Sequence, residues 1–411
     1  MPPITLFADK NLVLGVTGSI AAYKAADLAS KLTQAGARVD VVLTESATRF
    51  VTPLTFQSVT GRPAHADLWA ASGETHIAHV ALAEHAHLLV IAPATADVIA
   101  RLAHGLADDL LTVTALAVHC PLLVAPAMDA GMYEHPATQA NLKTLAERGV
   151  VLLGPAEGRM ASGLIGRGRL LEPEELFGHI RLALAHGGGL AGRHVVVSAG
   201  GTQEPIDPVR YVSNRSSGKQ GFALAQAALD RGAQVTLVSG PTALAAPAGA
   251  RMIPVQTAHE MAQAVLAASA NADVLLMAAA VADFRPAQVA SQKIKKTAVP
   301  EIQLEPTLDI LTAVAEARDQ SPLRRPAVIV GFAAESQNLI DNARAKVQRK
   351  GLSLIVANDI SASDAGFGVD TNRVTLIDAG GGIEALPLLT KTQVAEAVLA
   401  RVEKLLPPLA G

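Results

Sequence analysis

The chain has 411 residues, a formal charge of −3 and a single cysteine, Cys120. This length exceeds what one hydrophobic core usually organises and predicts two domains. The near-neutral charge gives no electrostatic case for nucleic acid or an anionic membrane as a partner, and a lone cysteine excludes an intrachain disulfide. Half of the residues are apolar but only 3% are aromatic, which is typical of buried parallel strands covered by Ala-rich helices.

The longest apolar stretch, residues 110–128, approaches the length of a membrane-spanning helix. His119, Pro121 and Pro126 interrupt it, so we expect a buried helix followed by a buried strand. The N-terminal residues lack the basic region and the long apolar run of a signal peptide, and we therefore expect a cytoplasmic protein.

The first half begins with a strand, a glycine turn, a helix and a second strand over residues 11–43, the order of a βαβ unit. The turn would direct the backbone N–H groups of Gly18, Ser19 and Ile20, with the positive end of the helix, at an anion. Small hydroxyl side chains follow other predicted strands, namely Thr44, Ser46 and Thr95. Three polar turns at one sheet edge predict a nucleotide or flavin crevice.

Three consecutive glycines at 187–189 separate the two halves, and we place the domain boundary there, with residues 1–187 in the first domain and 188–411 in the second. The second half also alternates apolar strands with Ala-rich helices, and it closes with a hairpin candidate at 373–388 and a helix. We therefore predict an α/β fold with two doubly wound, Rossmann-like parallel sheets.

A polar loop at residues 200–219 follows the first predicted strand of the second half. It combines two glycines with the side chains of Arg210, Asn214, Arg215 and Lys219, more anion-binding groups than solvation alone would require. The glycines allow the backbone to approach a ligand closely, so the loop is predicted to bind an anionic substrate.

A second group of candidates follows later strands. The strand end at 277–279 allows a nucleotide base or ribose to approach the backbone, and Asp283 can accept a hydrogen bond from it. Lys346 and Lys350 lie four residues apart, on one face of a predicted helix. Lys293 begins the basic run KIKK, which from the pattern alone is equally well a solvated charge cluster.

Long ordered motifs carry a family resemblance. The segments TGSIAAYK, GLADDLL and PAMDAGMYEHPAT resemble those of flavoprotein decarboxylases that act on a C-terminal or coupled cysteine. With the second half included, nearly the whole chain resembles the bacterial bifunctional phosphopantothenoylcysteine decarboxylase/phosphopantothenate–cysteine ligases of coenzyme A synthesis. The resemblance implies a first domain of the cysteine-decarboxylase flavoprotein type, a second domain that is a ligase, and a homo-oligomer of flavin-domain trimers joined by ligase-domain dimers.

For the first half, the resemblance implies FMN bound at the glycine turn and the hydroxyl-bearing strand ends. In the family, the catalytic histidine precedes an apolar-x-Leu pattern, which selects His79 over His76, and His79 would position or deprotonate the substrate. Asp129 stands where the family has an asparagine that binds the substrate carboxylate. Ser162 stands where it commonly has a cysteine that protonates the enethiol product of decarboxylation.

The glycine-rich segment 156–168 resembles the family's substrate flap. We expect a mobile flap that closes over the substrate, with glycines as hinges. Arg159, Arg167 and Arg169 could face the substrate phosphate.

For the second half, the resemblance implies a reaction with CTP and Mg²⁺, through metal ligands that the sequence does not identify. The carboxylate of 4'-phosphopantothenate would attack the nucleotide to form an acyl-cytidylate, and the cysteine amine would then displace CMP. Arg210 and Asn214 would hold the acyl intermediate, and Lys293 would contact the phosphates in the transition state. The implied CTP-binding residues are Met277, Ala278, Ala279, Asp283, Lys293, Leu308, Asp309, Ile310, Leu311, Phe332, Lys346 and Lys350.

Two alternatives remain beside the full bifunctional enzyme. Because Asp129 and Ser162 depart from the family pattern, the first half could be a structural flavin module, or a decarboxylase that releases the enethiol without reducing it. A third interpretation is a flavoprotein module that regulates a partner protein. The polar loop at 200–219 argues against it, because a pure binding module does not need such a loop.

Overall fold

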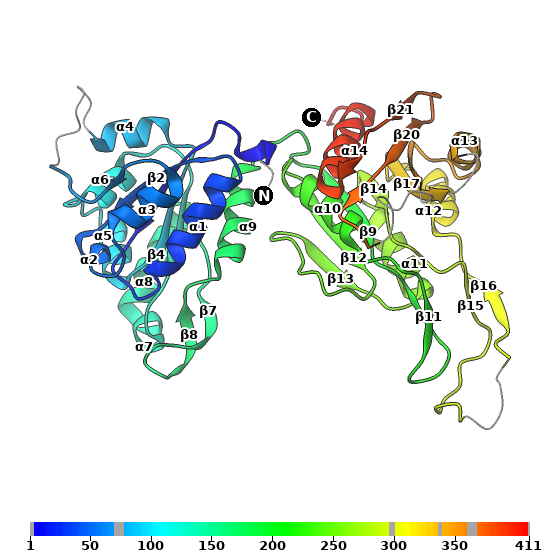
Figure 1. Ribbon diagram of the computed structural model, residues 1–411, viewed down its shortest axis with the longest axis horizontal. Coiled ribbons are helices and arrows are strands. Elements are labelled where there is room, and N and C mark those ends of the chain that lie inside the picture. The colour runs from blue at the N-terminus through cyan, green and yellow to red at the C-terminus, as the bar shows by residue number, and fades with distance from the viewer. Residues whose placement is uncertain (1–3, 70–77, 296–300, 336–338, 360–367, 410–411) are drawn as a thin grey trace. The chain divides into compact units, whose positions relative to one another are not determined.

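The computed structural model describes residues 4–69, 78–295, 301–335, 339–359 and 368–409. The chain divides into two compact units, Met1–Ala185 and His186–Gly411, each with its own sheet. The division lies two residues before the predicted boundary at 187/188. Figure 1 labels the elements of both units.

The first unit is a six-stranded parallel sheet in the order β3-β2-β1-β4-β5-β6. One core packs α1 and α9 on one face, and a second core packs α5, α6 and α8 on the other, so the sheet is doubly wound. The strands are β1 (Asn11–Val16), β2 (Arg38–Leu43), β3 (Ala64–His65), β4 (Leu88–Ala94), β5 (Leu122–Pro126) and β6 (Val151–Leu152). The helices are α1 (Ala22–Gln34), α2 (Glu45–Thr48), α3 (Pro53–Thr60), α4 (Ala78–His85), α5 (Ala96–His104), α6 (Leu110–Ala117), α7 (Ala130–Glu134), α8 (Pro136–Glu147) and α9 (Pro173–Leu184), preceded by the 3-10 turn Thr5–Phe7.

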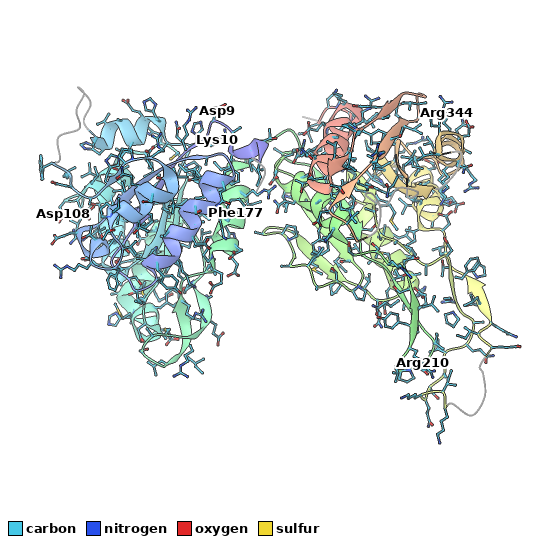
Figure 2. All side chains as sticks on the ribbon, in the orientation of Figure 1. Asp9, Lys10, Asp108, Phe177, Arg210 and Arg344 are labelled. Atoms are coloured by element: carbon cyan, nitrogen blue, oxygen red, sulfur yellow. The ribbon has the colours of Figure 1, made fainter. Side chains whose placement is uncertain are left out.

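The apolar stretch 110–128 forms the helix α6 and the buried strand β5, as expected. Among the described residues, no helix has the length and apolar character needed to cross a membrane. A separate antiparallel hairpin, β7 (Ala156–Arg159) and β8 (Ile165–Arg169), lies outside the main sheet and corresponds to the predicted flap. Phe7 stacks on Phe177 of α9, which is labelled in Figure 2, with ring centroids 5.2 Å apart, and this contact holds the N-terminal turn on α9.

The second unit has an eight-stranded sheet in the order β13-β12-β9-β14-β17-β18-β20-β21. Its first six strands in this order are parallel, and β20 and β21 form the antiparallel hairpin expected from the sequence. These strands are β9 (His194–Ala199), β12 (Gln234–Ser239), β13 (Arg251–Pro254), β14 (Val274–Met277), β17 (Val328–Glu335), β18 (Leu354–Asp359), β20 (Val374–Asp378) and β21 (Ile383–Ala385). The helices are α10 (Lys219–Leu229), α11 (Ala258–Ser269), α12 (Ile310–Gln320), α13 (Leu339–Arg349) and α14 (Lys391–Leu405).

Among the described residues, three small two-stranded antiparallel sheets complete this unit. They are β10 (Gln203–Pro205) with β11 (Tyr211–Ser213), β15 (Phe284–Pro286) with β16 (Leu304–Pro306), and β19 (Thr371–Asn372) with β22 (Leu389–Thr390). Figure 1 shows β11, β15 and β16 projecting away from the large sheet. We call the described residues of 203–213 and 284–306 the arm.

In the large sheet, β12 and β13 lie on one side of β9, and the chain then returns to β14 on the other side. Ligands of open α/β sheets bind beyond the carboxyl ends of the strands at such a reversal. The predicted fold class, α/β with two doubly wound Rossmann-like sheets, is confirmed.

Candidate active sites

A pocket of about 570 Å³ lies in the first unit, between the β1–α1 turn, the end of β5 and the flap hairpin. Short side chains and backbone form its floor, because each parallel strand ends there in a turn. The predicted residues that line it are Gly18, Ser19, Ile20, Thr95, Asp129, Ser162, Arg159 and Arg169. The structure thus brings the glycine turn together with both positions that depart from the family pattern.

Gly18 allows the β1–α1 turn to pass close to α2. A Cβ atom built on Gly18 would lie 2.4 Å from the Cβ of Ser46, far inside van der Waals contact. The N–H of Ser19 donates to the carbonyl of Thr17 at 2.8 Å and is not available to a ligand. Among the described groups, none accepts from the N–H of Gly18 or of Ile20. Two of the three predicted backbone donors are therefore open to an anion.

The hydroxyls of Thr44 and Thr95, at the other strand ends, accept hydrogen bonds from nearby backbone N–H groups. Thr44 accepts from the N–H of Ala47 at 3.3 Å and caps α2, and Thr95 accepts from the N–H of Val98 at 3.4 Å and caps α5. Thr95 lines the pocket, whereas Thr44 and Ser46 do not. Ser46 packs closely against Gly18. Their part in cofactor binding stays a prediction.

Ser162 lies between the flap strands and reaches the end of β5. Its Oγ donates to Oδ2 of Asp129 at 2.6 Å, and Oδ1 of Asp129 accepts from the N–H of Gly131 at 3.2 Å. The two departures from the family pattern are therefore one hydrogen-bonded pair. The carboxylate that replaces the family's asparagine has a hydroxyl donor within the pocket.

His79 lies elsewhere in the first unit. It is on α4, which Figure 1 shows at the opposite end of the unit from α7, β7 and β8, and it does not line the pocket. Its Nδ1 is buried and has no hydrogen-bond partner in the described part of the chain. One chain therefore does not bring His79 together with Asp129 and Ser162. The competing His76 lies outside the described residues.

Arg169 of the flap and Lys24, which was not predicted, both line the same pocket. Arg169 and Lys24 both contact Oε1 of Glu172, at 3.2 and 2.8 Å, and all but about a tenth of the Lys24 side chain is buried. Arg167 does not line the pocket and lies 5.6 Å from the ring centre of Tyr133. Sequence reasoning missed Lys24, because a lysine in the first turns of a helix usually faces solvent.

The second unit has a pocket of about 430 Å³ at the point where the strand order reverses. The predicted nucleotide residues that line it are Met277, Ala278, Ala279, Asp283, Leu308, Asp309, Ile310, Leu311, Phe332, Lys346 and Lys350. Lys350 contacts Oδ2 of Asp309 at 3.0 Å, and Asp309 caps α12 through the N–H of Thr312. Burial opposes ionisation of Asp309, but these donors outweigh burial and lower its pKa.

Arg210 and Lys293 lie on the arm and not in this pocket. Figure 2 labels Arg210 on the projecting part of the unit. Its Nη2 donates to the carbonyl of Ile294 at 2.9 Å, so the two predicted cations lie on segments that are joined to each other. Asn214 is nearer the pocket, because its Nδ2 donates to the carbonyl of the lining residue Ala280 at 3.0 Å.

Asp207 organises this part of the arm. Its Oδ1 accepts from the N–H groups of Val209 and Arg210, at 2.9 and 2.8 Å. Its Oδ2 accepts from Nε of Arg210 at 3.0 Å and from the N–H of Ile294 at 3.1 Å. The Arg210 guanidinium holds the pKa of the Asp207 carboxyl well below its ordinary value. Sequence reasoning missed Asp207, although it lies three residues before Arg210, the spacing of a capped turn.

The pocket of the second unit also has a wall that joins the end of the predicted anion-binding loop to residues given no role from the sequence. Ser216, Ser217, Gly218, Lys219, Gln220, Asn358, Asn372 and Lys391 line it. The side-chain oxygens of Gln220 and Asn358 are buried, and neither has a hydrogen-bond partner among the described residues. Lys219 belongs to the polar loop, but nothing in the sequence indicated that the start of α14 would join it.

Comparisons with known proteins agree with this two-part structure. Residues 6–184 match the family model described as Flavoprotein, and residues 190–406 match the DNA/pantothenate metabolism flavoprotein C-terminal domain. The chain is 45% identical over 404 residues to a coenzyme A biosynthesis bifunctional protein of Bacillus subtilis, covering 97% of each chain. It is 47% identical over 401 residues to the Mycobacterium tuberculosis (strain H37Rv) protein of the same name, covering 95% of each chain.

Solved structures of single domains are also similar. The crystal structure of the C-terminal domain of a coenzyme A biosynthesis bifunctional protein covers 53% of this chain and 97% of its own, with 39% identity and a TM-score of 0.45. A PPC decarboxylase mutant complexed with pantothenoylaminoethenethiol covers 42% of this chain and 97% of its own, with 33% identity and a TM-score of 0.39. The two family models and the full-length relatives confirm the predicted family and its pairing of decarboxylase and ligase. The chain therefore belongs to the family of coenzyme A biosynthesis bifunctional proteins.

Proposed function

We propose that the second unit joins 4'-phosphopantothenate to cysteine with CTP, and that the first unit decarboxylates the product to 4'-phosphopantetheine. The observation that carries this proposal is that each unit has a pocket lined by many of the residues predicted for its half-reaction. The partners are small molecules, and we also propose a cytoplasmic location.

In the second unit, the substrate carboxylate attacks the α-phosphate of CTP, pyrophosphate leaves, and the cysteine amine then displaces CMP from the acyl-cytidylate. Activation is needed because a carboxylate is a poor electrophile. Lys346 and Lys350, with the N-terminus of α12, line the pocket where phosphate charge grows. Asn214 lies at the rim to orient the acyl group.

Mg²⁺ is proposed to bind with the nucleotide. The described residues contain no group of three or more His, Cys, Asp or Glu side chains that could hold a metal by itself. This fits Mg²⁺, which usually binds through one or two carboxylates together with substrate phosphates and water. Asp283 lines the pocket and would hold the ion, whereas Asp309 is already paired with Lys350.

FMN is proposed for the first unit, because its pocket fits a phosphate-bearing cofactor. The close approach at Gly18, which a Cβ would prevent, leaves the N–H groups of Gly18 and Ile20 to bind a phosphate. When bound, FMN would take hydride from the carbon that bears sulfur and return it after CO₂ has left. Thr95 and the flap residues would cover the bound molecules.

Reduction of the enethiol that remains after loss of CO₂ requires a proton as well as a hydride, and the Asp129–Ser162 pair would supply this proton. The Ser162 hydroxyl proton would pass to the substrate carbon, and a proton from solvent would replace it by way of Asp129. The 2.6 Å contact between Oγ and Oδ2 provides the path. This arrangement gives the pocket a proton donor in place of the family's thiol.

The assembly is proposed to be a homo-oligomer joined through the arm and through the first unit. On the arm, Tyr211, Phe284 and Leu304 are each more than half exposed, which favours contact with a second copy. Arg210 and Lys293 lie on the same arm, away from the nucleotide pocket of their own chain. His79 is similarly remote from Asp129 and Ser162, so a second copy would complete each site.

Replacement of Gly18 by alanine is expected to remove flavin from the purified protein, because the new Cβ would overlap the Ser46 side chain. The double variant Gly18→Ala/Ser46→Gly removes the overlapping atom and should recover flavin. Visible flavin absorbance per chain measures both. Full flavin content in the single variant would contradict the proposed phosphate turn.

Replacement of Phe284 by aspartate is expected to give a smaller assembly, because it places a charge within the exposed apolar surface of the arm. Light scattering after size-exclusion chromatography measures the mass. Leu388, which is 40% exposed and lies outside the arm, is the matched control for Leu388→Asp. An unchanged mass for the Phe284 variant would exclude the arm as the contact.

A nucleotide series tests the ligase proposal. The protein with 4'-phosphopantothenate, cysteine and Mg²⁺ is expected to release pyrophosphate with CTP. Removal of Mg²⁺ by a chelator is expected to stop release, because the triphosphate charge is then not neutralised. Release with ATP but not CTP would correct the nucleotide and leave the reaction class unchanged.

A further inference from the structure

Lys391 is a buried cation that faces the pocket of the second unit. It is the first residue of α14, only 8% exposed, and it lines the pocket. Within the described parts of the chain, no oxygen accepts a hydrogen bond from its Nζ. Lysines buried to this extent are usually paired with an anion, and here the stem is buried while Nζ reaches only the solvent of the pocket. The missing partner is expected to be an anion that enters the pocket.

The neighbouring charged side chains do not neutralise Lys391. Burial lowers the pKa of Lys391, and the nearby cation Lys219 lowers it further, against the opposing effect of Asp370. Asp370 is itself engaged, because its Oδ1 lies 2.6 Å from Nζ of Lys219. Two lysines thus share one carboxylate, and the cluster keeps one net positive charge for a ligand.

A helix N-terminus lies beside the two lysines. Gly218 is the N-cap of α10 in the left-handed conformation, at φ 79°, and no side chain caps the helix. The first-turn N–H groups of Lys219, Gln220 and Gly221 donate to no described backbone carbonyl, and all three residues line the pocket. Gln220 also ties α10 to α14, because its Nε2 donates to the carbonyl of Lys391 at 3.1 Å. Backbone donors and both ammonium groups therefore meet on one wall.

This wall differs from the one already assigned to the nucleotide. Lys346 and Lys350 belong to α13 and its C-terminal end, and the helices α11, α12 and α13 share one core against the sheet. The helices α10 and α14 instead pack against each other. Figure 1 shows these two groups of helices as separate layers of the unit. The pocket is therefore bounded by two cationic walls that come from different elements.

We propose that Lys391, Lys219 and the N-terminus of α10 form a second phosphate-binding subsite of this pocket. It rests on the proposed ligase function and deepens it. A phosphate suits the wall better than a carboxylate does, because two ammonium groups and several N–H groups exceed what two carboxylate oxygens can accept. The phosphate is either the 4'-phosphate of the acyl substrate or a phosphate of the nucleotide.

Steady-state kinetics of Lys391→Met distinguish the two sources. The Michaelis constant for the substrate whose phosphate occupies the subsite is expected to rise about tenfold or more, because a charge-assisted contact is lost. The constant for cysteine should stay within about twofold of wild type, since cysteine carries no phosphate. Lys391→Arg keeps the charge and should restore most of the affinity. Lys404→Met, on the same helix but exposed, is the matched control.

A binding measurement tests the phosphate subsite independently of ligase activity. Calorimetry with inorganic phosphate should detect binding to the wild-type chain and its loss in Lys391→Met. Decarboxylation of synthetic phosphopantothenoylcysteine by the first unit reports that the variant chain is intact. Unchanged constants for both phosphorylated substrates, or a change for cysteine alone, would overturn the subsite. Absence of pyrophosphate release by the wild type would instead overturn the ligase, while phosphate binding would still decide the subsite.

Discussion

Replacement of Asp207 by asparagine is expected to lower ligase turnover on the order of 100-fold, because small displacements of catalytic groups have effects of this size. Both oxygens of Asp207 accept from N–H groups of the arm. An asparagine must turn its NH₂ group toward the donors of one oxygen, so at least two bonds are lost in either orientation. Arg210 and the segment of Lys293 would then lose their common anchor.

Pyrophosphate release measures the ligase, and decarboxylation of synthetic phosphopantothenoylcysteine in the same sample reports an intact first unit. The matched control is Asp319→Asn, which removes the carboxylate from another contact between neighbouring Asp and Arg side chains, with Arg318. The control should keep wild-type turnover. If Asp207→Asn also keeps it, the carboxylate does not position the arm for catalysis.

Replacement of Ser162 by alanine is expected to stop the first unit before the final proton transfer. The product should then be lighter than 4'-phosphopantetheine by one pair of hydrogens, while CO₂ is still released. The physical reason is the loss of the Oγ atom that would pass the proton from the Asp129–Ser162 pair to the substrate. We expect the yield of the reduced product to fall by about 100-fold, within the range for loss of a general acid.

Ser162→Cys is the matched variant, because a thiol can donate a proton by itself. It should form the reduced product even in the background of Asp129→Asn, whereas Asp129→Asn alone should not. Mass spectrometry of the product separates these outcomes. Full reduction by Ser162→Ala would exclude the pair as the proton source.

The glycine turns and strand ends were predictable from sequence, because their function depends on local backbone geometry. Gly18 follows a buried apolar strand directly, and residues 277–279 end another, so both had to lie at the carboxyl edge of a sheet. The doubly wound fold was predictable for the same reason. Alternating strands and helices leave few other arrangements.

The roles of the basic residues could not be predicted in this way. The family resemblance implied that Lys293 contacts the nucleotide phosphates, but within its own chain Lys293 lies on the arm, in the connection between β15 and β16 and outside the pocket. Lys391 was given no role from the sequence, where it lies at the start of the closing helix. Tertiary packing of α14 against α10 buries it, and no local pattern reports that contact.

The most direct test of the proposed function is one reaction with the purified chain, 4'-phosphopantothenate, cysteine, CTP and Mg²⁺. Pyrophosphate, CO₂ and the mass of the product are measured together. We predict one pyrophosphate and one CO₂ for each product molecule, and the mass of 4'-phosphopantetheine. Pyrophosphate without CO₂ would leave only a ligase, and no pyrophosphate with any nucleotide would contradict the account.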